Sequence, residues 1–477
     1  MNLKPEDSYQ PKPGNRIYRV PRMQPWKIRL PKIRPKKPLI GVSLLSLVYG
    51  FAAMIAVGTI LLMLPVSSNA GQWTSFINCL FTATSAVCVT GLAVVDTLTH
   101  WSFFGQFVIL VLIQLGGLGI TTSTTILMLA AGRKIGLRGR ILVGESVGVY
   151  KIGGIIRLAR NIALFTFAVE IIGGVIFYLR FSSQYEWPLS VWKSVFHTIS
   201  SFNNCGFDIF TGHESMAGYI NDFPVILTTA ILVILGGISF IVINDIFNSR
   251  GLHYSSLDTK LVILITGILI VLGTAVVFAT EYGNPQTLGG MSLPDKIMNA
   301  FFQSTISRTA GFSSFNTGGM AAYTLFFTMI LMFIGGAAGS TAGGIKVNTL
   351  GLILITVWET LLGREHPGAF GREFPVHQIF RALTLLVLAL GLIALVFFIL
   401  SITEPFPSLS ILFETVSAFG TVGLSTGITP ELSIVGKVVV IIAMFIGRLG
   451  PLTLSLSLAR TQKISNFRYP QDSIRIG

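Results

Sequence analysis

Residues Phe81–Leu92 read FTATSAVCVTGL, and the same pattern recurs three more times along the chain. Each copy has a Phe ten residues before a Gly, a small hydroxyl residue six before it, and Leu or Phe directly after it; the glycines are Gly91, Gly206, Gly311 and Gly423. Self-similarity at a period of about 110 residues indicates repeated structural units. Four unrelated turns in a chain with 50 glycines would have no reason to keep Phe in register.

The composition around these copies is that of a polytopic membrane protein. Hydrophobic residues make up 52% of the chain and charged residues 11%, about half the charge of a soluble protein. The net charge of +14 does not indicate nucleic-acid binding, because 11 of the 34 Lys and Arg residues lie in residues 1–37. We interpret this segment as a basic N-terminal arm on the cytoplasmic side of a plasma membrane. There it either contacts membrane lipid or serves only as a topology signal.

Each copy of the pattern ends a short apolar stretch that lies between two longer ones. The longer stretches suffice to cross a hydrocarbon core of ~30 Å, whereas the short ones fit re-entrant helices. The first spans are 38–64, 158–179, 257–280 and 376–402; the short helices are 73–87, 189–202, 294–307 and 408–419; the returning spans are 103–130, 223–247, 323 onward and 432–458. The sequence therefore predicts an all-α membrane protein with eight spans and four re-entrant helices.

Charged residues place the ends of these units. The segment after the second span is basic, which predicts a cytoplasmic loop, whereas the loops on the far side are mainly acidic. The far-side acids either concentrate cations at an outer mouth or are ordinary solvated charge. Both termini are expected in the cytoplasm. The predicted parts are the arm 1–37, the repeats 38–157, 158–256, 257–375 and 376–460, and a C-terminal tail 461–477.

The third returning stretch contains a glycine-rich interruption at 335–346. A single helix from 323 to 360 would be ~57 Å long, and so many glycines do not hold a helix well. Irregular backbone at membrane depth is tolerated where it is buried in protein or lines a wet cavity. We therefore expect a loop that faces water, with close helix packing through small residues as the alternative. A phosphate-binding loop does not fit, because no strand precedes the segment.

Two spans per unit bring every unit into the membrane from the same side, so the four repeats are parallel and can close around a pseudo-fourfold pore. The C-terminal ends of four re-entrant helices would then favour a cation near the axis. A ring of backbone carbonyls can replace the hydration shell of a monovalent cation. No carboxylate occurs in the strips that would form this ring, which are Val89-Thr90-Gly91, Asn204-Cys205-Gly206, Thr309-Ala310-Gly311 and Thr421-Val422-Gly423.

With its four filter glycines, its interrupted third return helix and the run Gly447-Arg448-Leu449-Gly450-Pro451-Leu452, the chain resembles the Trk/Ktr/HKT superfamily of potassium transport proteins. The resemblance covers residues from about 38 to the end; the N-terminal arm is not part of the shared pattern. One span precedes the first short helix, so the chain looks like the membrane subunit of Ktr systems (KtrB-type) rather than TrkH.

The resemblance implies uptake of K⁺ bound in the filter, with an influence of Na⁺ left open and no cofactor held by this chain. It also implies a homodimer and a cytoplasmic nucleotide-binding regulatory subunit of the RCK type (KtrA-like). By the same resemblance the interruption is an intramembrane gate that Arg448 meets from the fourth repeat. The gate residues would be Gly335, Gly336, Gly339, Ser340, Thr341, Gly343, Gly344 and Lys346.

Ionisable residues inside a membrane are functional candidates by default. Arg308 lies three residues before Gly311, so it must point away from the axis, and we expect it to brace the filter by pairing with an acid, for which Glu414 is one candidate. Arg448 and Lys346 either raise the barrier for ions or form salt bridges between helices. Glu170 is expected to hydrogen-bond between helices.

Two other functions compete with a pore. A secondary transporter of K⁺ coupled to Na⁺ or H⁺ predicts saturable, strictly coupled flux. An enzyme is not expected, since the six histidines lack ligand spacing. The three cysteines (Cys79, Cys88 and Cys205) are interpreted as small apolar residues.

Overall fold

The computed structural model describes residues 39–119, 155–210, 215–249 and 251–450, without the side chains of 39–47 and 155. The chain divides into Met1–Leu39 and Ile40–Gly477, and the second unit is described below. The basic arm 1–37, most of the basic loop after the second span and the tail 461–477 lie outside the described residues.

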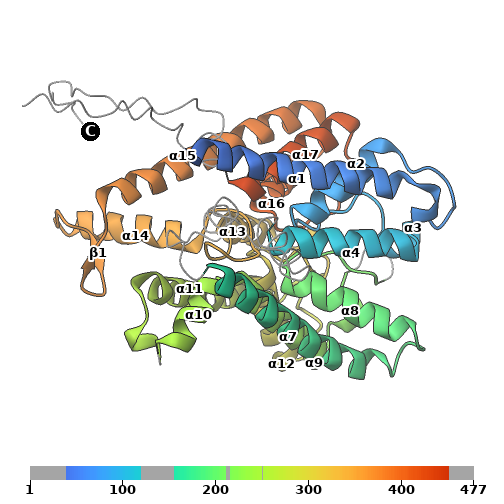
Figure 1. The fold of residues 1–477 in the computed structure, drawn as a ribbon. Helices are drawn as coiled ribbons and strands as arrows, with labels where there is room; N and C mark the ends of the chain where they lie inside the picture. The colour runs from blue at the N-terminus through green and yellow to red at the C-terminus, as the bar shows by residue number, and fades with distance from the viewer. Residues whose placement is uncertain (1–38, 120–154, 211–214, 250, 451–477) are drawn as a thin grey trace, which may run out of the picture. The chain divides into compact units, whose positions relative to one another are not determined.

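The described part of the chain is helical apart from one small hairpin (Figure 1). Each predicted unit contains a first helix, a short helix and a return helix. The first helices are α1 (Leu39–Met63), α7 (Ile155–Phe181), α11 (Leu257–Glu281) and α15 (Val376–Thr403); the short helices are α2 (Phe76–Val87), α8 (Leu189–Phe202), α12 (Leu293–Ile306) and α16 (Ser408–Gly420). The return helices are α4 (Phe103–Gly117), α9 (Phe223–Gly237) with α10 (Phe240–Asn248), α13 (Ala322–Phe333) with α14 (Val347–Leu361), and α17 (Ile434–Leu449). The remaining elements are α3 (Thr97–His100), five single-turn 3₁₀ helices, and strands β1 (Gly368–Ala369) and β2 (Arg372–Glu373).

Each return helix packs against the short helix of the next unit. The pairs are α4 with α8, α9 with α12, α13 with α16, and α17 with α2. The last pair joins the fourth unit back to the first, and Figure 1 shows α2 and α17 next to each other although they lie near opposite ends of the chain. The four units therefore close in sequence order.

The recurrent Phe explains part of this packing. Phe81, Phe196 and Phe413 are each 0% exposed, and Phe301 is partly buried against the cluster that contains Phe413. One large apolar side chain on each short helix thus faces the protein interior, which is why the position repeats.

Three described helices are long and apolar enough to cross a membrane: Ile156–Phe181, Leu257–Glu281 and Val376–Thr403. A fourth is reached if α9 and α10 count as one broken span. The predicted spans 103–130 and 432–458 run into residues that are not described, so the count of eight stays a prediction. Mostly helical architecture agrees with the expected all-α membrane protein.

The second return helix differs from the expectation of one continuous stretch over 223–247. α9 and α10 are bent by 87° at a break between Gly237 and Phe240. Two successive glycines weaken the helix there, and Ser239 starts a new one by accepting the Ile241 N–H at 3.2 Å. The pair Gly236-Gly237 was the signal that could have predicted this break.

Candidate functional site

The structure brings the four glycine strips together. Gly91, Gly206, Gly311 and Gly423 all have positive φ, from 65° to 92°, where a residue with a Cβ is strained. A Cβ added to Gly91 would collide with the Cys205 carbonyl oxygen, and one added to Gly206 would meet the Ala310 carbonyl oxygen. Since each glycine abuts the next strip, only a residue without a side chain fits.

The contacts run on around a closed ring. A Cβ on Gly311 would meet the Val422 carbonyl oxygen, and one on Gly423 would collide with the Thr90 carbonyl oxygen of the first strip. The carbonyl that precedes each glycine therefore lies against the glycine of a neighbouring strip. In addition, the hydroxyl oxygens of Thr90 and Thr421 are buried without a hydrogen-bond partner among the described residues. Such a ring can offer several oxygens to one cation.

The recurrent hydroxyl residue holds the strips in two repeats. The Ser85 Oγ accepts the Gly91 N–H at 3.0 Å, and the Ser417 Oγ accepts the Gly423 N–H at 3.1 Å. In the second repeat the Ser200 Oγ instead donates to the Phe207 carbonyl at 2.5 Å. In the third repeat the Thr305 hydroxyl bonds the Phe301 carbonyl of its own helix, so the hydroxyl six residues before the glycine supports the strip region in three of the four repeats.

The third strip is built differently from the others. Val89, Asn204 and Thr421, each two residues before a glycine, have left-handed φ of 57°, 58° and 49°, and Thr309 at the same position does not. The Ala310 N–H accordingly bonds the Ile306 carbonyl four residues back, whereas the Thr90 N–H bonds Ser85 five back. The ring is therefore only approximately fourfold.

A cavity of about 620 Å³ opens on one side of the glycines. All four glycines line it, together with Asp96 and Asp208 from the first and second units. Burial raises the pKa of Asp208 to about 6, although hydrogen bonds from the Phe210 N–H and the Ser215 side chain pull it down. At neutral pH the carboxylate is thus mostly ionised and adds negative charge to the cavity wall.

The segment 335–346 covers the opposite side of the ring. Its Thr341 side chain donates to the Gly236 carbonyl of α9 at 2.9 Å. A Cβ on Gly343 would collide with the Thr421 hydroxyl, and one on Gly344 would lie 3.4 Å from the Gly420 carbonyl. Since Gly420 and Thr421 precede the fourth filter glycine, the segment lies directly beneath that strip.

The segment is buried on both sides of its tip, whereas Ala338 at the tip is exposed and Gly339 and Ser340 are partly exposed, so only this part fits the expected loop that faces water. Ala337, Thr341 and Ala342 are at most 3% exposed. The chain folds back on itself, with the Gly335 N–H donating to the Ile345 carbonyl at 2.8 Å, and Gly339 and Gly344 take φ of 78° and 66°. The glycines permit this tight reversal between the ring and the broken return helices.

Arg448 and Lys346 both bind carbonyls of this region. The Arg448 guanidinium donates to the Thr341 carbonyl, and to the Gly116 carbonyl at 2.6 Å. The Lys346 ammonium donates to the Ala342 carbonyl at 2.5 Å. Arg448 thus joins the segment to the first return helix α4.

Glu414, the candidate partner of Arg308, pairs with other groups. The Glu414 carboxylate instead accepts the Ser425 hydroxyl, the Thr426 N–H at 3.2 Å and the Thr429 hydroxyl at 2.9 Å. These donors come from the loop after the fourth strip, so Glu414 holds that loop. Within the part of the chain that the structure describes, the buried Arg308 Nε has no hydrogen-bond partner.

The expectations for Glu170 and for the three cysteines can also be compared with the structure. Glu170 accepts from the Asn203 amide at 3.5 Å, which joins α7 to the end of α8. The three cysteines are buried and free. Among the described residues, no group of three or more His, Cys, Asp and Glu side chains could hold a metal ion.

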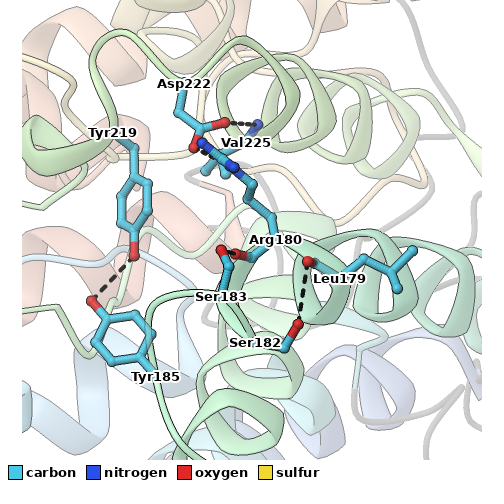
Figure 2. A network of polar contacts seen from close by, with 8 residues as sticks. All are labelled: Leu179, Arg180, Ser182, Ser183, Tyr185, Tyr219, Asp222 and Val225. Atoms are coloured by element: carbon cyan, nitrogen blue, oxygen red, sulfur yellow. Dashed lines mark hydrogen bonds and ion pairs between the residues drawn. The ribbon is translucent and has the colours of Figure 1, made fainter.

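A set of ties at the other end of the helices was missed by sequence reasoning. In the last three units the end of the first helix is joined to the N-cap of the return helix, and in the first unit the 3₁₀ turn Pro65–Ser67 after α1 makes the corresponding contact. In the second unit the Arg180 Nε donates to Asp222 at 2.6 Å, as Figure 2 shows. Asp222 also accepts the Val225 N–H at 3.3 Å, and the Tyr219 and Tyr185 hydroxyls lie 3.2 Å apart nearby (Figure 2).

The other units use different groups for the same tie. The Ser102 N–H donates to the Ser67 carbonyl at 2.9 Å, the Ala321 N–H to Glu281 at 3.0 Å, and the Ser433 N–H to Glu404 at 3.1 Å. In the last three units the signal in the sequence was an acid beside a predicted helix end, which the loop-charge interpretation overlooked.

Comparison with known proteins finds relatives of this chain in sequence and in fold. The family described as "TrkH: Cation transport protein" matches residues 45–468. The chain is 44% identical to "Ktr system potassium uptake protein B" of Bacillus subtilis, over 90% of this chain and 96% of that protein. It is 39% identical to "Potassium/sodium uptake protein NtpJ" of Enterococcus hirae, over 94% and 99%. The crystal structure of the potassium transporter TrkH from Vibrio parahaemolyticus is similar in fold, with a TM-score of 0.71 at 20% identity over 90% of this chain and 87% of that one.

Proposed function

Because the chain belongs to the TrkH family of cation transport proteins and is of the KtrB type, we propose that it takes up potassium through the ring of glycine strips. The family is one of transport proteins and not of enzymes. K⁺ is the cargo, and this chain needs no cofactor of its own. The names of two relatives, which speak of potassium and of potassium/sodium uptake, support this substrate.

The observation that carries the proposal is the closed set of contacts between Gly91, Gly206, Gly311 and Gly423. Carbonyl oxygens converge there between a cavity that carries two aspartates and a packed segment. Backbone oxygens without a carboxylate suit a monovalent cation. Selectivity would then reside in the carbonyls of the four strips.

The pore is proposed to be pseudo-fourfold. From the sequence pattern we further propose eight spans and four re-entrant helices in the plasma membrane, with both termini in the cytoplasm. The closed order of return helix on short helix supports the fourfold arrangement. The short helices α2, α8 and α16 end at the strips, and their C-terminal carbonyl ends favour a cation.

The segment 335–346 is proposed as the gate. It lies beneath the ring and contacts the second unit through Gly236 and the fourth unit through Thr421 and Arg448. Arg448 in turn binds the Gly116 carbonyl of the first unit. The word "system" in the relatives' names supports partner subunits. We expect the chain to work as a homodimer with a cytoplasmic RCK-type nucleotide-binding subunit that moves this segment.

A transporter that couples K⁺ to Na⁺ or H⁺ is the second candidate, and the name of the potassium/sodium relative is what favours it. In such a protein the segment 335–346 would take part in a transport cycle. The two candidates differ in whether a gradient of the second ion is required.

Uptake of ⁸⁶Rb⁺ into liposomes that hold the purified protein separates them. We expect passive uptake driven by an inside-negative potential, strong competition by K⁺ and weak competition by Na⁺. Uptake that requires an imposed Na⁺ or H⁺ gradient would favour the coupled transporter over the pore. Equal competition by K⁺, Na⁺ and Li⁺ would show that the ring does not select K⁺.

A further inference from the structure

The entry of the segment 335–346 is held by a side chain that the gate assignment does not include. The Ala338 N–H donates to the Asn348 Oδ1 at 2.9 Å. Asn348 is the second residue of α14, the helix that resumes after the segment. Its side chain therefore reaches back across the segment and fixes the position of Ala338.

The orientation of this amide is settled by its partner. A backbone N–H can only donate, so the oxygen of Asn348 must face Ala338 and its NH₂ group must face the other way. There the Asn348 Nδ2 donates to the Oδ1 of Asp258, the second residue of α11. A charged acceptor makes this the stronger kind of hydrogen bond.

The helix end that carries Asp258 is held by hydrogen bonds to α10. α11 begins with Ser256 as N-cap, and the Ser256 N–H and Thr259 hydroxyl donate to Asp245 of α10 at 2.9 and 2.5 Å. Two helices at this end are thus tied together, and Asn348 links them to the segment.

Ala337, the residue before Ala338, is also held by a hydrogen bond. The Ala337 N–H donates to the Gly237 carbonyl at 3.0 Å, at the break between α9 and α10. The far part of the segment is held by Arg448 at Thr341. Moving the entry of the segment away from the ring must therefore break the bond to Asn348, unless α14 and α11 move with it.

We propose that Asn348, oriented by Asp258, is a positioning residue that latches the gate shut and sets the resting flux. The inference rests on the proposed role of 335–346 as the gate. The latch lies outside the ring of carbonyls, so it governs how often the path opens and leaves ion preference alone.

The test is resting ⁸⁶Rb⁺ influx of the full-length protein in liposomes without any partner. Asn348→Ala removes the link, and we expect influx to rise about tenfold, as loss of a hydrogen-bonded link of this kind allows, with the K⁺ over Na⁺ competition ratio unchanged. Asn348→Asp should raise influx too, because two carboxylates then face each other. Asp258→Asn should stay near wild type, since its amide oxygen still accepts from Asn348.

The exchanged pair Asn348→Asp with Asp258→Asn is the decisive variant. The carboxylate introduced at position 348 would still accept from the Ala338 N–H, and the amide introduced at position 258 would donate to that carboxylate. Influx should therefore return to the wild-type level at unchanged net charge. A merely destabilising substitution would not be rescued in this way, and size-exclusion profiles check that each variant is folded.

The outcomes separate the latch from the function it rests on. Influx in Asn348→Ala and Asn348→Asp equal to that of the wild type would overturn the latch alone. Failure of the folded exchanged pair to restore the wild-type rate would overturn it as well. No ⁸⁶Rb⁺ influx in any variant or in the wild type would overturn both the latch and the proposed pathway.

Discussion

The four ring glycines have two reasons to be glycine. Their φ lies between 65° and 92°, and an added Cβ would meet backbone of a neighbouring strip. The second reason matters more for function, because the atoms that would be displaced are the carbonyl oxygens proposed to bind K⁺. A substitution there perturbs the proposed ion site itself.

Gly423→Ser is expected to lower discrimination between K⁺ and Na⁺ about tenfold. A non-glycine residue at such φ carries strain of about 1–3 kcal/mol, and ~1.4 kcal/mol is a factor of ten. Competition of Na⁺ and K⁺ against ⁸⁶Rb⁺ uptake measures the ratio. Gly391→Ser in α15 is the matched control, since nothing lies within 4 Å of its added Cβ. An unaltered ratio in Gly423→Ser would refute the role of the ring.

Asp208 predicts a dependence on external pH. Its pKa is raised to about 6 by burial, so the carboxylate is charged at pH 7 and protonated as the pH falls through about 6. Asp96 and Lys193 are the charged groups that act on it. A unit charge at ~8 Å in a water-like medium is worth about 0.5 kcal/mol, so half-saturation by K⁺ should rise about twofold from pH 7 to pH 5.

Asp208→Asn is the control for this dependence. It should show the higher half-saturating concentration at both pH values, since the amide carries no charge. If the variant keeps the full pH dependence, another group titrates and the assignment to Asp208 fails.

Among the helices, the broken return helices and the segment 335–346 form one assembly. The end of α9 leaves carbonyls without intrahelical donors, and the segment supplies donors through Ala337 and Thr341. The break in the second unit is therefore the docking place for the interruption in the third. Opening the segment must expose or re-pair these carbonyls.

Thr341→Val tests this docking. It removes the hydroxyl bond to the Gly236 carbonyl, worth about 1 kcal/mol net, so resting influx should rise about fivefold. Thr356→Val in α14 is matched, because that hydroxyl only bonds its own helix at Leu352, 2.7 Å away. Equal influx in the two variants would mean that this hydroxyl does not hold the segment in place.

Local patterns predicted the elements well where one signal dominated. The short helix over 189–202 and the first span over 257–280 agree with α8 and α11 almost residue for residue, since apolar runs are bounded there by capping or turn residues. The bend after Gly237 was missed because its cause is partly the carbonyls that a distant segment caps. Glu414 was a candidate partner of Arg308, but its donors come from its own unit, and spacing alone does not rank such partners.

At the scale of the whole molecule, the four glycine strips meet without a single carboxylate among them. The fourth unit is the last one along the chain, and contacts between α17 and α2 join it to the first unit. The Lys437 ammonium adds a bond to the Asn78 side chain at 3.3 Å at this seam. Closure places four carbonyl-bearing strips around one point, and this point is where K⁺ is proposed to bind.

Anomalous diffraction from crystals of the protein grown with Rb⁺ in place of K⁺ tests this binding site. We expect an anomalous peak enclosed by the carbonyls of Thr90, Cys205, Ala310 and Val422, which excess K⁺ displaces and the same excess of Na⁺ does not. Ordered strips with no peak between them would contradict the proposed carbonyl site.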